Sequence, residues 1–227
     1  MGLILKGLGT VLAGTATGAT VGVAYLTAAT NVTTPLSEDD EIWRTTNYTR
    51  LNQFQNPSVQ DRCWKRLPLS KVRPELRNDE EAIATEFFRG LWAGYAFAPQ
   101  RSIATLVAKG PKTNTQLFSK EELGASTYEP GTQFSDHFEV LERTRNAVMF
   151  RAGGSPLEPG PRVVDGILIA SAEIDKEADT VEVSLKSLFF NSAQPVDKGK
   201  KAMPGPIEWL HQVYARAMVD DGARHLK

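Results

Sequence analysis

The chain has 227 residues, a formal net charge of −1 and a single cysteine. One cysteine excludes an internal disulfide and a cysteine-based metal site. The balanced charge, without a basic cluster, argues against nucleic-acid binding, so neither DNA nor RNA is expected as a partner.

The N-terminal segment has the most unusual composition in the chain. Residues 7–37 contain no charged side chain, and the apolar stretch Gly7–Ala29 exceeds the roughly 20 residues that a helix needs to cross a bilayer. We therefore predict a single-pass transmembrane anchor over residues 1–30. Two alternatives remain open: a cleaved signal peptide in which Lys6 forms the charged region, and a peripheral or buried glycine-rich segment.

Three glycines recur at four-residue spacing in this segment: Gly14, Gly18 and Gly22. They fall on one face of a helix, where small residues let a second helix approach closely within lipid. The pattern predicts helix–helix pairing through this face.

Flanking charge predicts the orientation of the anchor. Lys6 is the only charged side chain before it, whereas residues 38–41 are acidic, and a positive flank tends to remain in the cytoplasm. The main domain is then expected on the lumenal side of the endoplasmic reticulum or secretory pathway. Residues 31–60 are predicted to form a polar linker, in which the sequons at Asn31 and Asn47 are candidate glycosylation sites.

Residues 61–227 are long enough for a single domain with a ligand-binding or catalytic core. Residues 62–67 alternate as a short strand. A helix then opens near Asp79 and repeats apolar residues every four positions: Ile83, Phe87, Leu91 and Tyr95. Gly90 and Gly94 leave the opposite side of this helix bare, which favours close packing.

Four runs in the second half are typical of strands: Gln133–Glu142, Ala147–Ala152, Val163–Ile174 and Thr180–Phe190. Short polar connections indicate antiparallel hairpins, and a final amphipathic helix starts at Pro206. This order predicts an α+β fold in which a curved antiparallel sheet packs on a long C-terminal helix. The order is similar to the START-like helix-grip arrangement. A nuclear-transport-factor-like cone or a barrel with peripheral helices is the alternative.

Two aspartates interrupt apolar strand faces. Alternation places Asp136 on the same face as Phe134 and Phe138, and Asp165 on the same face as Ile167. Two carboxylates facing one cavity can divide acid–base work, because one takes a proton from water while the other donates a proton. We predict Asp136 and Asp165 as catalytic residues. The alternative is structural: hydrogen bonds from backbone amides to Asp165, and an arginine partner for Asp136.

Aromatic side chains on the predicted helix are candidates for a substrate pocket: Phe88, Trp92 and Tyr95. Arg162 is a candidate for binding substrate. Core packing is the commoner role for such aromatic residues, and a surface or ion-pairing position is the commoner role for such an arginine. His137, His211 and His225 lack the spacing of metal ligands, so no metal site is predicted. Because serine-hydrolase, phosphate-loop and dinucleotide signatures are missing from the sequence, no cofactor is predicted either.

Six short stretches together resemble a group of small filamentous-fungal proteins that often have a hydrophobic N-terminus. The stretches cover residues 62–69, 88–95, 131–134, 165–166, 186–190 and 205–211. The nearest functional counterparts are the hydrolases assigned to the aurovertin and citreoviridin polyene-pyrone pathways, which are proposed to open epoxides during ether-ring formation. The resemblance implies this kind of reaction but transfers no catalytic residue.

These observations predict a membrane-anchored tailoring enzyme of fungal secondary metabolism. It would hydrolyse or cyclise an apolar polyketide epoxide by carboxylate acid–base chemistry. The first alternative is a non-catalytic, membrane-tethered protein that binds a lipid or metabolite in the same cavity. The second is a structural membrane adaptor that pairs through Gly14, Gly18 and Gly22.

Overall fold

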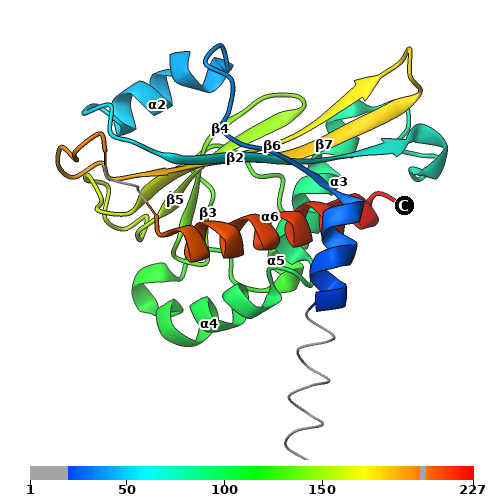
Figure 1. Cartoon of the computed structure of the whole chain (residues 1–227). Coiled ribbons are helices and arrows are strands. Elements are labelled where there is room, and N and C mark those ends of the chain that lie inside the picture. Colours follow the sequence, from blue (N-terminus) through cyan, green and yellow to red (C-terminus); the bar gives the residue numbers. More distant parts are fainter. Residues whose placement is uncertain (1–19, 200–202) are drawn as a thin grey trace, which may run out of the picture.

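The computed structural model describes residues 20–199 and 203–227. In these residues, seven antiparallel strands form one curved sheet with the order β1-β2-β7-β6-β5-β4-β3 (Figure 1). The strands are β1 (Asn31–Thr33), β2 (Val59–Pro68), β3 (Gln133–Phe134), β4 (Phe138–Arg143), β5 (Ala147–Gly153), β6 (Asp165–Asp175) and β7 (Thr180–Phe190). The predicted α+β class, with a curved antiparallel sheet and a C-terminal helix, is confirmed.

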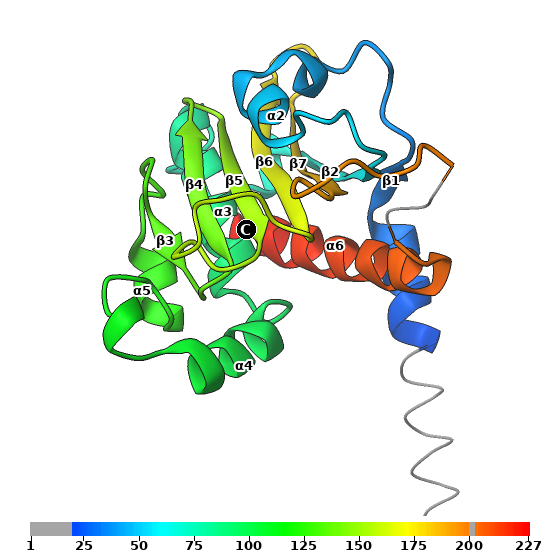
Figure 2. The same ribbon diagram turned by 90° about the vertical axis from the view of Figure 1, so that its left-hand side faces the viewer.

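Most of the helices, including the long ones, lie together on one face of the sheet, and one short helix lies on the other face (Figures 1 and 2). The first group comprises α3 (Glu80–Ala93), α4 (Ala98–Ala108), α5 (Lys120–Ala125) and the terminal helix α6 (Gly205–His225). The opposite face carries η1 (Glu41–Arg44) and α2 (Thr46–Leu51), while η2 (Leu69–Lys71) and η3 (Pro111–Thr113) lie in connections. The sheet therefore separates two layers of unequal size.

Strand alternation divides the apolar side chains between these layers. On β6, Leu168 and Ala170 belong to the large core under α3 and α6, whereas Ile167 belongs to a small cluster with Ile42 and Leu51. The large core is built around the Trp92 ring. Four phenylalanine rings lie 4.8–5.2 Å from it, centroid to centroid: Phe97, Phe134, Phe138 and Phe150.

Glycines let α3 and α6 cross at short distance, as the bare side of the predicted helix indicated. A Cβ atom added at Gly90 would lie 2.6 Å from the Cβ of His225 and 2.8 Å from the Cα of Gly222. A Cβ atom at Gly222 would lie 2.7 Å from the Phe87 ring. These separations are too short for any larger residue, so the glycine pair sets the distance between the two helices.

The segment 31–60 differs from the linker that its polar composition predicts. β1 pairs with β2, so that Asn31 lies opposite Trp64, and Ile42 and Leu51 are buried against the sheet. A few apolar side chains at wide spacing are enough to hold the segment, although they leave its average composition polar. Of the two sequons, Asn31 is exposed, whereas Asn47 is half-buried and donates to Glu142 over 3.4 Å.

Residues 20–29 form a helix that lies against α6. The Tyr25 hydroxyl donates to Asp220 over 3.3 Å, and the Arg216 guanidinium donates to the Thr30 carbonyl over 2.7 Å. Among the described residues, none of the helices combines the length and apolar character needed to cross a bilayer. Residues 1–19, with Gly14 and Gly18, lie outside the described part, so the anchor stays a prediction. Gly22 faces open space.

Candidate active site

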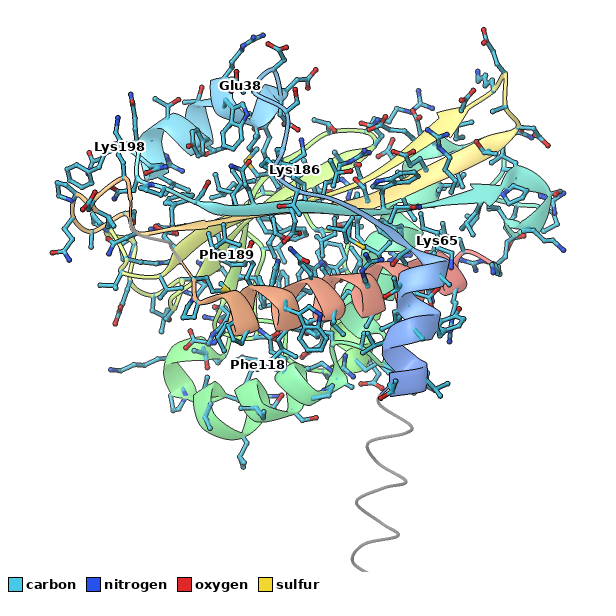
Figure 3. The ribbon with its side chains drawn as sticks, in the orientation of Figure 1. Glu38, Lys65, Phe118, Lys186, Phe189 and Lys198 are labelled. Carbon is cyan, nitrogen blue, oxygen red and sulfur yellow. The ribbon has the colours of Figure 1, made fainter. Side chains whose placement is uncertain are left out.

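An apolar pocket of about 260 Å³ lies between α6 and the sheet. Figure 3 shows one of its wall residues, Phe189, on the side of the sheet that faces α6. The other apolar and aromatic lining residues are Trp92, Phe138, Ala152, Gly153, Leu168, Leu185, Tyr214, Ala215 and Met218. Four polar side chains also line the pocket: Gln100, His137, Ser187 and His211. A mostly apolar pocket with a few polar groups is typical of a small-molecule site.

A buried carboxylate and an imidazole meet at the wall of this pocket. Asp61 on β2 is fully buried, and its Oδ2 atom lies 3.1 Å from Nε2 of His211 on α6. The two atoms are close but not aligned for a hydrogen bond. Neither Asp61 oxygen nor this His211 nitrogen has a hydrogen-bond partner among the described residues. A buried carboxylate without hydrogen bonds costs free energy, so the Asp61–His211 contact is a candidate for a functional role.

Two further side chains that line the pocket have a buried polar atom without a hydrogen bond to the described residues. The Ser187 hydroxyl and the Trp92 indole N–H have no hydrogen-bond partner within the described part of the chain. Ser187 lies directly opposite Asp61 in the pairing of β7 with β2. Buried polar groups without partners are rare in folded proteins, so these atoms indicate a place for a ligand or ordered water.

A hydrogen bond between two helices lies beside these groups. The Tyr214 hydroxyl on α6 donates to Oε1 of Gln100 on α4 over 3.0 Å. Burial raises the pKa of Tyr214, and the nearby Arg101 opposes this only in part. The phenol is therefore protonated at neutral pH and serves as a hydrogen-bond donor.

Asp165 is held by a complete set of hydrogen bonds. Arg151 binds both of its oxygens, with Nε–Oδ1 and Nη2–Oδ2 distances of 3.0 and 2.7 Å. Ser192 donates to Oδ2 over 2.6 Å, and the Gly166 amide donates to Oδ1 over 3.0 Å. Asp165 also lies on the sheet face opposite the pocket, as does Ile167. Its environment is that of a structural ion pair.

Asp136 lies in a hairpin turn and not on a strand. Residues 133–142, predicted as one strand, divide into β3 and β4, and both Ser135 and Asp136 have a φ of +52°. The apolar alternation continues across the turn because Phe134 pairs with Phe138, which conceals the turn in the sequence. Asp136 accepts from Ser155 over 2.5 Å and from Gln116 over 3.3 Å. This corrects the expectation that Asp136 and Asp165 face one cavity.

The predicted substrate-binding residues are dispersed. Trp92 lines the pocket. Phe88 is buried in the core, edge to face with Tyr128 at 6.4 Å, and Tyr95 is 83% exposed. Arg162 is fixed in a loop, where its guanidinium donates to the carbonyls of Ser155 and Glu158, and burial lowers its pKa. Of these four residues, only Trp92 lines the pocket under α6.

The positions of Asp61 and His211 in the hydrophobic pattern could have identified them from the sequence, whereas a search for metal-ligand spacing could not. On β2, Asp61 occupies an inward position between Val59 and Cys63. On α6, His211 lies four residues before Ala215, which is buried on the apolar face. A charged or ionisable residue at a core position on each element is therefore the pattern to search for. No group of three or more metal-binding side chains occurs in residues 20–199 and 203–227.

Comparisons of the chain with protein-family models, with curated proteins and with solved structures returned no match.

Proposed function

We propose that this chain is a small-molecule enzyme in which His211, oriented by Asp61, transfers a proton at an apolar substrate. The observation that carries the proposal is the buried Asp61–His211 pair, whose carboxylate oxygens lack hydrogen-bond partners among the described residues. A histidine oriented by a buried carboxylate is a common general base. The apolar pocket beside the pair determines the class of substrate.

The geometry supports a division of roles. His211 lines the pocket, whereas Asp61 lies behind it, on the side of Nε2. A carboxylate at one ring nitrogen orients the imidazole and leaves Nδ1 for the substrate or water. Ser187 and Trp92 line the same pocket and carry donors that are unpartnered among the described residues, and we propose that these donors stabilise an oxygen that becomes negative during the reaction.

The reaction we propose is the opening of an epoxide in an apolar polyketide, by water in a hydrolase or by an internal hydroxyl in a cyclase. His211 takes the proton from the attacking oxygen as that oxygen forms its bond to an epoxide carbon. The carbon–oxygen bond of the epoxide breaks, and the departing oxygen receives hydrogen bonds. It then receives, by way of a water molecule, the proton that His211 took, which returns His211 to its neutral form. In this proposal, Asp61 and His211 replace the Asp136–Asp165 pair of the sequence-based mechanism.

The volume of the pocket limits what it can enclose. At about 260 Å³, it lies just below the range of about 300–1,000 Å³ that is common for ligand pockets. We infer that the reacting end of a long polyene enters, while the remainder of the substrate stays outside. The mostly apolar lining favours an apolar, membrane-partitioned substrate over a polar metabolite.

We also propose that the domain has a START-like helix-grip arrangement. The first long strand, β2, pairs with the last strand, β7, and α3 and α4 lie between β2 and β3 in the chain. The terminal helix α6 covers the concave side, with an apolar pocket beneath it. We also propose that the uncharged segment from residue 7 anchors the protein to a membrane, with the domain on the lumenal side.

The test compares turnover and binding of trans-stilbene oxide, an apolar epoxide. We expect His211→Gln to reduce diol formation about 100-fold or more, the usual contribution of a general base. Quenching of tryptophan fluorescence should show that the variant still binds the probe. His225→Gln is the matched control, because His225 lies on the same helix but pairs with Glu86 outside the pocket.

The second candidate function is a non-catalytic binding protein that uses the same pocket. The apolar lining and the unpartnered donors favour a ligand whether or not it reacts. Binding of trans-stilbene oxide without turnover, together with equal affinity in wild type and His211→Gln, would support this candidate and contradict the enzyme. Loss of binding in His211→Gln would instead assign His211 to ligand recognition.

A further inference from the structure

Helix α4 exposes large apolar side chains on the surface of the domain. Ile103, Leu106 and Val107 are 62, 85 and 73% exposed. Of the eleven residues of α4, Ala104 alone is buried in the described structure. A contiguous apolar helix face of this kind is typical of a surface that binds a membrane or another protein.

The stretch of chain that contains α4 is rich in basic residues. Residues 87–120 contain five basic side chains and no acidic one: Arg89, Arg101, Lys109, Lys112 and Lys120. Lys109 follows the last residue of α4 directly, and Lys112 lies in η3. Apolar side chains beside lysines are the combination that binds the interface of a bilayer with anionic lipids.

The uncharged N-terminal chain leaves the domain on the same side. The helix over residues 20–29 and α4 both lie on the side of the sheet that carries α6, in both views (Figures 1 and 2). Contacts of Tyr25 with Asp220 and Arg224 attach this helix to α6. Nineteen residues precede it, and those from Gly7 onward carry no charged side chain.

A second group of exposed apolar side chains lies in the first turns of α6. Ile207, Trp209 and Leu210 are 52, 55 and 56% exposed. Tryptophan is enriched where proteins meet the interface of a bilayer, because its ring is apolar and its N–H is polar. The first turns of α6 and the helix α4 lie on the same side of the sheet (Figure 2).

We propose that α4 and the first turns of α6 dock on a bilayer that contains anionic lipid. α4 lies in the plane of the interface, with Leu106 and Val107 in the apolar layer and Lys109 and Lys112 at the headgroups. A bilayer is the occupant because the uncharged chain emerges on this side and because Lys109 and Lys112 follow the apolar face of α4. The proposal rests on the membrane association in the proposed function but not on its chemistry.

Docking would bring the pocket to the lipid surface. Gln100 belongs to α4 and lines the pocket, and it accepts the hydrogen bond from Tyr214 of α6. The docked helix therefore borders the site into which an apolar substrate must move. This position would let the substrate pass from the bilayer to His211 without crossing bulk water.

The test places a fluorescent label on the docking face of the full chain. Cys63 is fully buried, and burial raises its pKa to about 12, so a thiol reagent labels an added cysteine selectively. We label Leu106→Cys with an environment-sensitive nitrobenzoxadiazole group and add phosphatidylcholine vesicles containing phosphatidylserine. The emission should move to shorter wavelength, and lipids with a spin label in the acyl chain should quench it.

The control carries the same label on the opposite side of the sheet. Phe54 is 40% exposed and follows α2, so Phe54→Cys should show no shift with the same vesicles. Replacing both Lys109 and Lys112 by Glu should weaken the response of labelled Leu106→Cys to anionic vesicles. An unchanged response in this charge-reversed protein would contradict the role assigned to the lysines.

Two other outcomes would overturn the docking surface. If the protein co-sediments with vesicles while the Leu106→Cys label does not respond, the N-terminal segment alone holds the protein. If the label shifts with protein concentration and without vesicles, a second copy covers α4. Adding His211→Gln to the labelled protein separates the proposals, because turnover should fall while the lipid response remains.

Discussion

Asp61 and Ser187 are direct register partners on β2 and β7, and both side chains face α6. Side chains at such positions have Cβ atoms about 4.5–5.5 Å apart. His211 of α6 packs against Asp61. The strand pairing and the helix thus place an acid, a hydroxyl and an imidazole together at one wall of an apolar pocket. Four predictions test this arrangement and the packing that supports it.

Asp61 should reduce stability while it serves function. Its carboxylate is fully buried, and both oxygens lack hydrogen-bond partners in the described structure. We expect Asp61→Leu to raise the free energy of unfolding by about 1–3 kcal/mol and to abolish turnover. Urea denaturation measures the first effect. A loss of stability would show that Asp61 has a structural role.

Unlike Asp61, Asp165 should contribute to stability and not to turnover. Asp165→Asn leaves Arg151 buried without its anionic partner, so we expect a loss of about 3–5 kcal/mol in the free energy of unfolding. At a temperature where the variant remains folded, its turnover should equal that of the wild type. A folded but inactive Asp165→Asn protein would return this residue to the list of catalytic candidates.

Glu86 should make the protein sensitive to acid. Burial acts to raise its pKa, but hydrogen bonds from Arg73 and Arg89 outweigh this, so the pKa lies below its ordinary value of 4.5. The folded state therefore binds the proton less readily than the unfolded state. The resulting stability is present above pH 4.5 and is lost as the pH falls through the lower pKa of the folded protein.

Urea denaturation of Glu86→Gln at neutral pH and below pH 4.5 tests this linkage. The free energy of unfolding should fall less on acidification in the variant than in the wild type. An equal fall in both proteins would assign the acid sensitivity to other carboxylates.

The crossing of α3 and α6 should depend on Gly222. Alanine in a helix usually stabilises relative to glycine by about 1 kcal/mol, but here its Cβ atom would lie 2.7 Å from the Phe87 ring. We expect Gly222→Ala to lower the free energy of unfolding by about 1–3 kcal/mol, because overpacking outweighs helix propensity.

Thermal unfolding of Gly222→Ala should be compared with that of Gly124→Ala. A Cβ atom at Gly124 on α5 would meet its nearest neighbour, the Cβ of Ala93, at 3.6 Å, which is an ordinary contact. Gly124→Ala should therefore be neutral or stabilising. Stabilisation by Gly222→Ala as well would mean that the two helices can separate at little cost.

Much of the architecture follows from local patterns. The runs at 147–152, 163–174 and 180–190 correspond closely to β5, β6 and β7, because period-two alternation describes a sheet with one layer on each face. The helix from Glu80 and the helix that includes Pro206 likewise follow from apolar spacing and end signals. The turn at Asp136 could not be predicted from these patterns, because Phe134 and Phe138 preserve the apolar alternation across it.

The sequence by itself determined the fold class, the uncharged N-terminal segment and the presence of Trp92 on a helix with a broad aromatic face. Only the tertiary structure decided which ionisable residues meet. Asp61 and His211 belong to elements that are far apart in the sequence, and the packing of α6 on the paired strands β2 and β7 brings them to 3.1 Å. Periodicity assigns a side chain to a face of its own element, whereas the contact between two faces depends on the packing of the whole sheet and helix.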